Sequence, residues 1–324
     1  MLPRSRLVLA LVALAVLAPA SIVAAVGLVA ARDAHLADAI ASGEIDRARE
    51  MVAFGGDPEW DTLATLPDPS IAWLLEIGAV ADVDAAAVEL VDAGRTKAVG
   101  LCLDRGARSE GLVLRAAIAG RAETLALLLD RGAAGREAAL VEAARKQRSD
   151  AGLLLLSLGV SPDPLGEEDP LWYAARNADV SLVRAMLATP IHEDRRQRAL
   201  CAATSGEPMS GERLPLAGAL RETLDALVAG KARVRGKSPL PLVCAAWNGN
   251  RETAAYLLDR GARVDDCDEK RGTALATAVF RGDAEMVRLL LERGASPAKA
   301  CPPETKSAWE MARESDIRAL LGRE

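Results

Sequence analysis

Pairs of glycines twelve residues apart recur along this chain. In each pair, the first glycine ends one short helical pattern and the second glycine ends the next. Such self-similarity predicts a solenoid, in which each unit buries its apolar face against its neighbours. It also favours binding over catalysis as the function. The pairs are Gly43 and Gly55, Gly94 and Gly106, Gly120 and Gly132, Gly218 and Gly230, Gly249 and Gly261, and Gly282 and Gly294.

Composition indicates the class of secondary structure. Half of the 324 residues are apolar, which is enough to build a core and argues against disorder. Aromatic residues make up only 3% of the chain while Ala and Leu dominate, so we expect an all-α protein. The formal charge of −6 argues against general binding to a nucleic-acid backbone.

An uncharged apolar run at residues 7–31 precedes the repeats. It is long enough to cross a bilayer with some tilt, and Arg4 and Arg6 favour a cytoplasmic segment at residues 1–6. Everything after residue 32 would then lie on the outer face of the membrane, in the periplasm or the exterior. A cleaved signal peptide and secretion to the periplasm are the alternative, because Ala18-Pro19-Ala20 fits the cleavage pattern.

The five cysteines are widely spaced and include no Cys-x-x-Cys motif. Only His35 and His192 could complement them in a metal site, and we expect both histidines to be exposed to solvent. Cys244 is expected to fill a small core position. Cys267 and Cys301 lie in adjacent connecting loops. Because neighbouring repeats usually sit too far apart for a relaxed disulfide, the sequence favours free thiols there and leaves a bridge open.

Two segments thirty-three residues apart give the clearest repeat, Leu240–Asn248 and Thr273–Arg281. Each predicts a short first helix that ends at a glycine, followed by a second helix that ends at the next glycine. In the second of these units, the longer apolar residues of the second helix should provide much of the burial. These residues are Met286, Val287, Leu290 and Leu291.

The two segments resemble the ankyrin repeat. The family pattern T-P-L-H-x-A-A…G…V-x-x-L-L-x-x-G-A is readable in Leu240–Ala262 and in Thr273–Ala295. Its first half recurs in Asp169–Ala175 and more faintly in Ser307–Ala312. Elsewhere the second helix is the better preserved half, as in Glu44–Asp57, Arg95–Ala107 and Arg121–Ala133. The resemblance implies a solenoid of stacked helix-turn-helix units over most of residues 35–324.

Some units depart from the family pattern. The step from Gly94 to Gly120 is 26 residues and Gln147 follows 27 further on, against about 33 in the family, so these units should lack the projecting β-turn finger. An insertion at residues 207–220 separates a first helix from its partner. We therefore expect degenerate units over residues 35–235, the best-matching units over residues 238–306, and a C-terminal capping unit over residues 307–324.

No catalytic pattern stands out in the sequence. Gly236-Lys237-Ser238 ends like a phosphate-binding loop but lacks the glycine five positions earlier. The acidic run at residues 265–269 lacks the Gly and the distal Glu of a calcium loop. We expect no enzymatic activity, cofactor, metal, small-molecule substrate or nucleic acid.

The resemblance implies that a protein partner contacts the fingertips and the exposed end of each first helix. Trp247 and Phe280 occupy equivalent places in adjacent repeats, where they either anchor an interface or pack across the seam between repeats. Trp172 and Tyr173 fall inside a first helix and are expected in the core. The candidate partner-binding residues are Lys237, Pro239, Trp247, Asn248, Glu269, Lys270, Phe280 and Arg281.

A basic stretch with cations at every second position runs through residues 231–237. It is either a solvated loop or a surface that attracts an acidic partner or anionic lipid headgroups.

The sequence thus predicts a non-catalytic protein–protein interaction scaffold on the outer face of a bacterial cytoplasmic membrane. The Ala-rich, Arg-rich and Lys-poor composition favours a bacterial origin. A structural spacer in an envelope assembly and an enzyme with an unrecognised site are the alternatives. A spacer predicts a featureless concave surface, a binder predicts an exposed apolar patch at Trp247 and Phe280, and an enzyme predicts a deep pocket lined by groups with shifted pKa.

Overall fold

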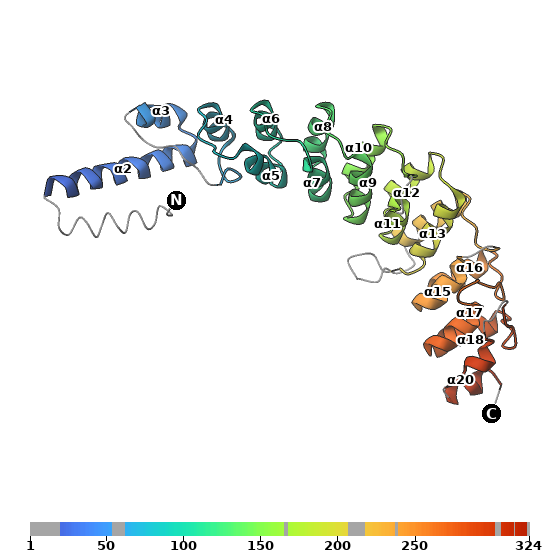
Figure 1. Cartoon of the computed structure of the whole chain (residues 1–324). Coiled ribbons are helices and arrows are strands. Elements are labelled where there is room, and N and C mark those ends of the chain that lie inside the picture. The colour runs from blue at the N-terminus through green and yellow to red at the C-terminus, as the bar shows by residue number, and fades with distance from the viewer. Residues whose placement is uncertain are drawn as a thin grey trace. The chain divides into compact units, whose positions relative to one another are not determined.

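The computed structural model describes residues 20–53, 62–164, 168–206, 218–236, 239–301, 306–313 and 315–322. Within these ranges the regular structure is α-helical, with one isolated antiparallel bridge between Asp268 and Gly272 (Figure 1). The expectation of an all-α fold is therefore confirmed for the described residues. The chain divides into two compact units, residues 1–115 with 126–133 and residues 116–125 with 134–324.

The first unit begins with α2, a helix that continues without a break beyond residue 31, where the predicted apolar run ends. Within the described ranges, no helix is both long enough and apolar enough to cross a membrane. Residues 7–19 of the predicted span lie outside the described residues. The helices of this unit are α2 Ala20–Ser42, α3 Ile45–Ala53, α4 Asp68–Glu76, α5 Val83–Ala93 and α6 Thr96–Asp104. Two further helices contribute residues to both units, α7 Leu112–Ala119 and α8 Ala122–Asp130.

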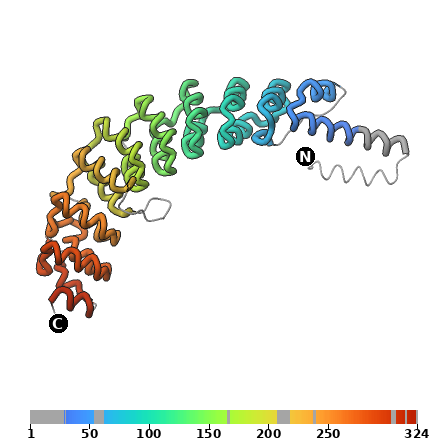
Figure 2. The backbone as a smooth tube through the Cα atoms, turned by 180° about the vertical axis from the view of Figure 1, so that it is seen from behind, coloured from blue at the N-terminus to red at the C-terminus, as the bar shows by residue number. Residues whose placement is uncertain are grey.

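The second unit is a stack of helix pairs in two layers. First helices pack on first helices, from α9 through α11, α13, α15 and α17 to α19, and the second helices form the other layer (Figure 2). Each layer buries the apolar face of the other, as the repeat pattern predicts. The helices are α9 Arg136–Arg145, α10 Ser149–Ser157, α11 Pro170–Arg176, α12 Val180–Leu187, α13 Glu193–Ala203, α14 Ala219–Ala229, α15 Pro241–Asn248, α16 Arg251–Asp259, α17 Ala274–Arg281, α18 Ala284–Glu292, α19 Ala308–Met311 and α20 Ser315–Leu320.

Small residues in the first helices and long ones in the second helices make the core. Ala245 and Ala246 of α15 are fully buried, which lets α15 and α17 approach closely. In α18, Met286, Val287 and Leu290 are fully buried as predicted, whereas Leu291 is only half-buried. Full burial of one such side chain contributes about 1.5–3 kcal/mol, so these residues hold α18 on its neighbours.

The glycines that define the repeat end helices in most of the described pairs. Gly249 and Gly282 close α15 and α17 with φ of 66° and 72°, a left-handed conformation that glycine adopts without strain. The pair of Gly218 and Gly230 is the exception: Gly218 precedes α14 as its N-cap residue instead of ending a helix, and Gly230 closes α14 with φ of −73°. A Cβ atom there would lie 2.9 Å from Cδ1 of Leu187, so glycine lets this side chain pack closely against the end of α14. Gly55 lies outside the described residues.

Short steps between repeats remove the finger, as expected. Residues 105–111 connect α6 to α7 and residues 131–135 connect α8 to α9, whereas residues 260–273 connect α16 to α17. The Asp268 to Gly272 bridge lies in this longer connection. We call residues 262–272 the finger.

Candidate functional site

Helices α15 and α17 bring two aromatic side chains together. The first turn of α15 contains Pro241, and α17 is preceded by its N-cap residue Thr273, whose hydroxyl oxygen accepts a hydrogen bond from the Ala276 backbone N–H at 3.1 Å. The two helices start and end at equivalent positions of adjacent repeats and pack against each other. Trp247 and Phe280 lie in their last turns and therefore meet.

The rings of Trp247 and Phe280 stack, with centroids 6.1 Å apart and planes inclined by 12°. Such a pair contributes about 0.5–1.5 kcal/mol beyond the area it buries. Even so, 37% of Trp247 and 64% of Phe280 remain exposed. The pair thus packs across the seam between repeats and also presents an aromatic surface to solvent, so the two sequence alternatives do not exclude each other.

Two arginines flank this pair. The guanidinium carbons of Arg271 and Arg281 lie 5.2 Å and 5.7 Å from the centroid of the Trp247 ring. Both distances are within the range of cation–π attraction. Arg281 was a sequence-predicted site residue, whereas Arg271 was missed. Its position directly after Lys270 in the finger was the available signal.

Asp268 shapes the finger from within. Its backbone exchanges two hydrogen bonds of 2.9 Å with Gly272, and only 2% of the residue is exposed. Its carboxylate accepts hydrogen bonds from the backbone N–H groups of Lys270 and Arg271, each at 3.1 Å. It also accepts one from Leu240 at 3.2 Å, which joins the finger to the start of α15. The fold thereby places Glu269 and Lys270 at an exposed tip.

Pro239 and Asn248, two further predicted site residues, are less accessible to a partner than Trp247 and Phe280. Pro239 is half-buried, and its carbonyl oxygen accepts a hydrogen bond from Gln197 Nε2 at 2.9 Å. Asn248 is half-buried beside Trp247 at the end of α15. Lys237 lies outside the described residues. The structure therefore brings together Trp247, Phe280 and Arg281 with the adjacent finger.

A disulfide joins Cys267 of the finger to Cys301, with Cα atoms 5.6 Å apart. The expectation that neighbouring connections lie too far apart for a bridge is wrong here. The finger turns back through its Asp268 to Gly272 bridge, and Asp265 accepts a hydrogen bond from the Ser296 backbone N–H at 2.9 Å. The two connections therefore lie against each other.

A second disulfide joins Cys201 of α13 to Cys244 of α15, again with Cα atoms 5.6 Å apart. Cys244 is buried as predicted, but it is bonded to a partner in addition to filling space. Cys102 of α6 is a free, fully buried thiol. Its burial raises its pKa to about 11, so the thiolate is disfavoured at neutral pH.

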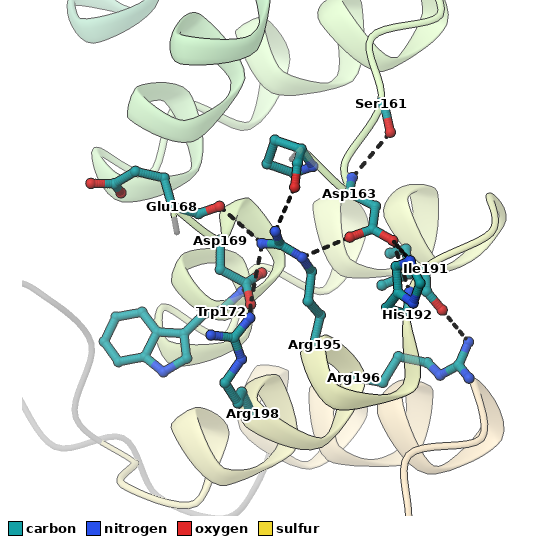
Figure 3. A network of polar contacts seen from close by, with 11 residues as sticks. Ser161, Asp163, Glu168, Asp169, Trp172, Ile191, His192, Arg195, Arg196 and Arg198 are labelled. Carbon is teal, nitrogen blue, oxygen red and sulfur yellow. Dashed lines mark hydrogen bonds and ion pairs between the residues drawn. The ribbon is translucent and has the colours of Figure 1, made fainter. Parts of the chain in front are cut away.

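A separate cluster of charges surrounds Arg195 on α13 (Figure 3). Its Nε lies 2.6 Å from Asp163 Oδ1, and its other nitrogens donate to the backbone carbonyls of Pro164 and Glu168 at 2.5 Å and 2.9 Å. Arg195 is buried, and all three partners belong to the connection between α10 and α11. The arrangement fastens this connection to α13, and we assign it a structural role.

Asp169 belongs to the same cluster. It caps α11 by accepting a hydrogen bond from the Trp172 backbone N–H at 3.1 Å, and it lies 3.3 Å from Arg198 Nη2. Burial raises the pKa of Asp169, and the Trp172 N–H and the nearby guanidinium groups only partly oppose this shift. His192 stays 86% exposed at its side chain, as expected.

Trp172 and Tyr173 correct a sequence expectation. They are half-buried and not in the core, and a guanidinium group lies over each ring. The guanidinium carbon of Arg176 lies 5.4 Å from the Trp172 ring centroid, and that of Arg145 lies 4.7 Å from the Tyr173 ring centroid. The charged side chains cover the apolar rings while keeping their own contact with water.

The stacked helix pairs and the disulfide-linked finger define a helical repeat protein. Residues 216–300 match the family described as "Ankyrin repeats (3 copies)", and these residues are ankyrin repeats. No curated protein matches the sequence.

Two solved structures are similar to part of this chain. One is the ankyrin repeat domain of Bcl-3, described as a unique member of the IkappaB protein family, with 21% identity and a TM-score of 0.49 over 65% of this chain and 97% of that one. The other is the human ASB11 ankyrin repeat domain, with 20% identity and a TM-score of 0.41 over 74% of this chain and 97% of that one.

Proposed function

We propose that this chain is a non-catalytic scaffold that binds a partner protein through the finger and the ends of α15 and α17. Ankyrin repeats generally mediate protein–protein interactions, and residues 216–300 carry such repeats. The observation that carries the proposal is the exposed stack of Trp247 and Phe280. Stacked aromatic residues beside arginine are the composition of binding hot spots, and a spacer would have no need to expose them.

Display outside the cytoplasm is part of the same proposal. Residues 7–31 would anchor the chain with residues 1–6 inside, and the repeats would face the periplasm or the exterior of a bacterial cell. The two disulfides support this placement, because such bonds persist in oxidising compartments and are rare in the cytosol.

Crosslinking followed by pull-down from membranes tests the binding surface. The native chain is compared with Trp247→Ala/Phe280→Ala and with a matched control, Ile118→Ala/Leu158→Ala. The control removes two exposed apolar side chains from other helix pairs. We expect the native chain and the control to capture the same partner, and the aromatic double variant to lose it. Identical partner sets from all three folded proteins would reject this surface.

A reporter fused after residue 324 tests the orientation. We expect activity from a reporter that works only outside the cytoplasm. Activity from a cytoplasmic reporter would overturn the proposed topology without affecting the binding surface.

A further inference from the structure

We propose that the partner segment at this surface is an acidic stretch of protein with apolar side chains among its carboxylates. The inference rests on the proposed function and adds the chemistry of the partner. It follows from how the structure distributes charge over the finger and its neighbours, although the whole chain is acidic with a formal charge of −6.

The carboxylates of the finger are directed to the backbone. Asp265 accepts a hydrogen bond from Ser296 N–H at 2.9 Å and Asp266 accepts one from Gly236 N–H at 3.3 Å. Asp268 is buried against three further N–H groups. These acceptors are therefore already used by backbone N–H groups of the finger and of neighbouring connections. Glu269 is the exposed acidic residue of the finger.

The cations of the same surface are directed outward. Lys270, Arg271 and Arg281 are exposed, and in the described parts of the chain none of the three forms an ion pair. Exposed Arg235 and Lys299 add a cation to the preceding and following connections, also without a described carboxylate partner. Cations thus face solvent around the aromatic stack, whereas three of the four finger carboxylates bond to backbone N–H groups.

The aromatic stack lies among these cations. Arg271 and Arg281 lie over the Trp247 ring, and the Phe280 ring packs against the same indole while most of its own surface stays open. A partner with an apolar side chain can cover Phe280 while a neighbouring carboxylate pairs with a guanidinium group. Charge complementarity therefore favours an acidic segment over a neutral or basic one.

A protein segment fits better than a lipid surface. A flat anionic bilayer would meet Glu269 at the tip of the finger together with the cations. A peptide can place its carboxylates beside the arginines and leave the surroundings of Glu269 uncharged. Binding of anionic vesicles is accordingly the competing outcome in the test.

The test uses the purified full chain in a neutral detergent and three blocked twelve-residue peptides. Every third residue of each peptide is Leu or Phe, and the other positions are Ser alternating with Glu, Gln or Lys. Anisotropy of an uncharged dye on the peptide reports binding. We expect the Glu peptide to bind at least about tenfold more tightly than the Gln peptide, with weaker binding at higher salt, and the Lys peptide to bind least.

Charge reversal identifies the surface. Arg271→Glu/Arg281→Glu should weaken binding of the Glu peptide at least about tenfold. The matched control is Arg136→Glu/Lys146→Glu at the two ends of α9, which makes the same change in net charge at two exposed cations and should leave binding unchanged. Circular dichroism establishes that both variants are folded.

Several results would overturn the inference. They are undetectable binding of the Glu peptide, equal affinity for the Glu and Lys peptides, an equal loss in both charge-reversal variants, or preferential binding to phosphatidylglycerol vesicles. The pull-down separates the two proposals. A partner that depends on Trp247 and Phe280 but is captured equally by Arg271→Glu/Arg281→Glu rejects only the acidic segment, whereas a partner set unaffected by either pair rejects the binding surface itself.

Discussion

The residue after the turn that joins two helices of a pair is used differently in two regions of the molecule. In the pairs with short steps it is Arg95 before α6 and Arg148 before α10, and neither side chain caps its helix. In the later pairs it is an Asp or Asn that does cap. Asp179 accepts from Leu182 N–H at 3.0 Å, Asn250 from Thr253 N–H at 3.1 Å, and Asp283 from Met286 N–H at 2.9 Å.

The arginines of the short-step region connect to the preceding repeat instead. Arg95 donates to the carbonyl oxygen of Leu66, and Arg148 Nε donates to that of Ile118 at 3.0 Å. Gly120 makes room for this contact, because a Cβ atom there would lie 2.8 Å from Arg148 Cδ. Arginine at this position thus joins two repeats without capping a helix. Asp179 and Asn250 do both, because Asp179 also accepts a hydrogen bond from Ser149 Oγ and Asn250 Nδ2 donates to the Ser205 carbonyl oxygen, both in the preceding repeat.

Around Asn250 and Asp283 the difference accompanies the finger. In the later region, the finger joins neighbouring connections through Asp265, Asp266, Asp268 and the Cys267–Cys301 disulfide. With this link in place, Asn250 and Asp283 cap their own helices. Where the connection is too short to form a finger, an arginine side chain donates a hydrogen bond to a backbone carbonyl of the preceding repeat. This bond replaces part of the contact between repeats that a finger would make.

The finger disulfide should give the largest effect. Replacing Cys267 and Cys301 by Ser should destabilise the C-terminal repeats by about 3 kcal/mol, because the bond closes a loop with a sequence separation of 34. Hydrogen exchange of the α17 and α18 amides measures this loss region by region. A loss confined to well under about 1 kcal/mol would show that hydrogen bonds alone hold the finger.

Thiol titration is the control for that prediction. Of the five cysteines, none should react with a thiol reagent in the native unreduced protein, because the remaining thiol, Cys102, is buried with its pKa raised to about 11. Unfolding without reductant should expose one thiol. Detection of more than one thiol would contradict the disulfide pairing.

Asp283→Ala should cost about 1 kcal/mol through loss of the cap of α18. The Met286 backbone N–H donates its hydrogen bond to the Asp283 carboxylate, so its hydrogen exchange should increase most directly. Asp283→Asn is the matched control, since an amide oxygen can accept the same bond. Equal losses in the two variants would mean that the charge and not the cap matters.

Gln147→Gly should stabilise the α9–α10 pair by about 1 kcal/mol. Gln147 adopts φ of 57° at a turn where other pairs have glycine, and its side chain is exposed. Gly249→Ala at the equivalent turn, where φ is 66°, should have the opposite sign. The midpoint of urea unfolding compares the two variants. Stabilisation by both, or by neither, would contradict strain as the cause.

Arg148→Ala should give the smallest effect, about 0.5 kcal/mol, because its hydrogen bond is exposed to solvent. Arg136→Ala is the control, since Arg136 is exposed and has no described side-chain partner. Urea unfolding of the full chain measures both. A loss of stability for Arg148→Ala as large as that for Asp283→Ala would contradict the expectation that the cap contributes more than the arginine hydrogen bond.

Much of the site could be located from the sequence. The thirty-three-residue step placed Trp247 and Phe280 at equivalent helix ends, and the structure stacks them. The same alignment could not reveal Arg271, whose contact with Trp247 depends on how the finger turns back over the first helix. Nor could it reveal that the Pro239 carbonyl oxygen accepts a hydrogen bond from Gln197, which lies on α13.

The features that can be derived from the sequence are local. Glycine spacing, capping residues and apolar periodicity set where helices begin and end and which connections have a finger, because these depend on hydrogen bonds and backbone conformation within a few residues. The packing of one repeat on the next determines the two disulfides, the hydrogen bonds from neighbouring backbone to the finger carboxylates and the outward position of the cations. Those contacts join residues roughly one repeat apart, and small differences in how repeats stack determine whether such residues meet.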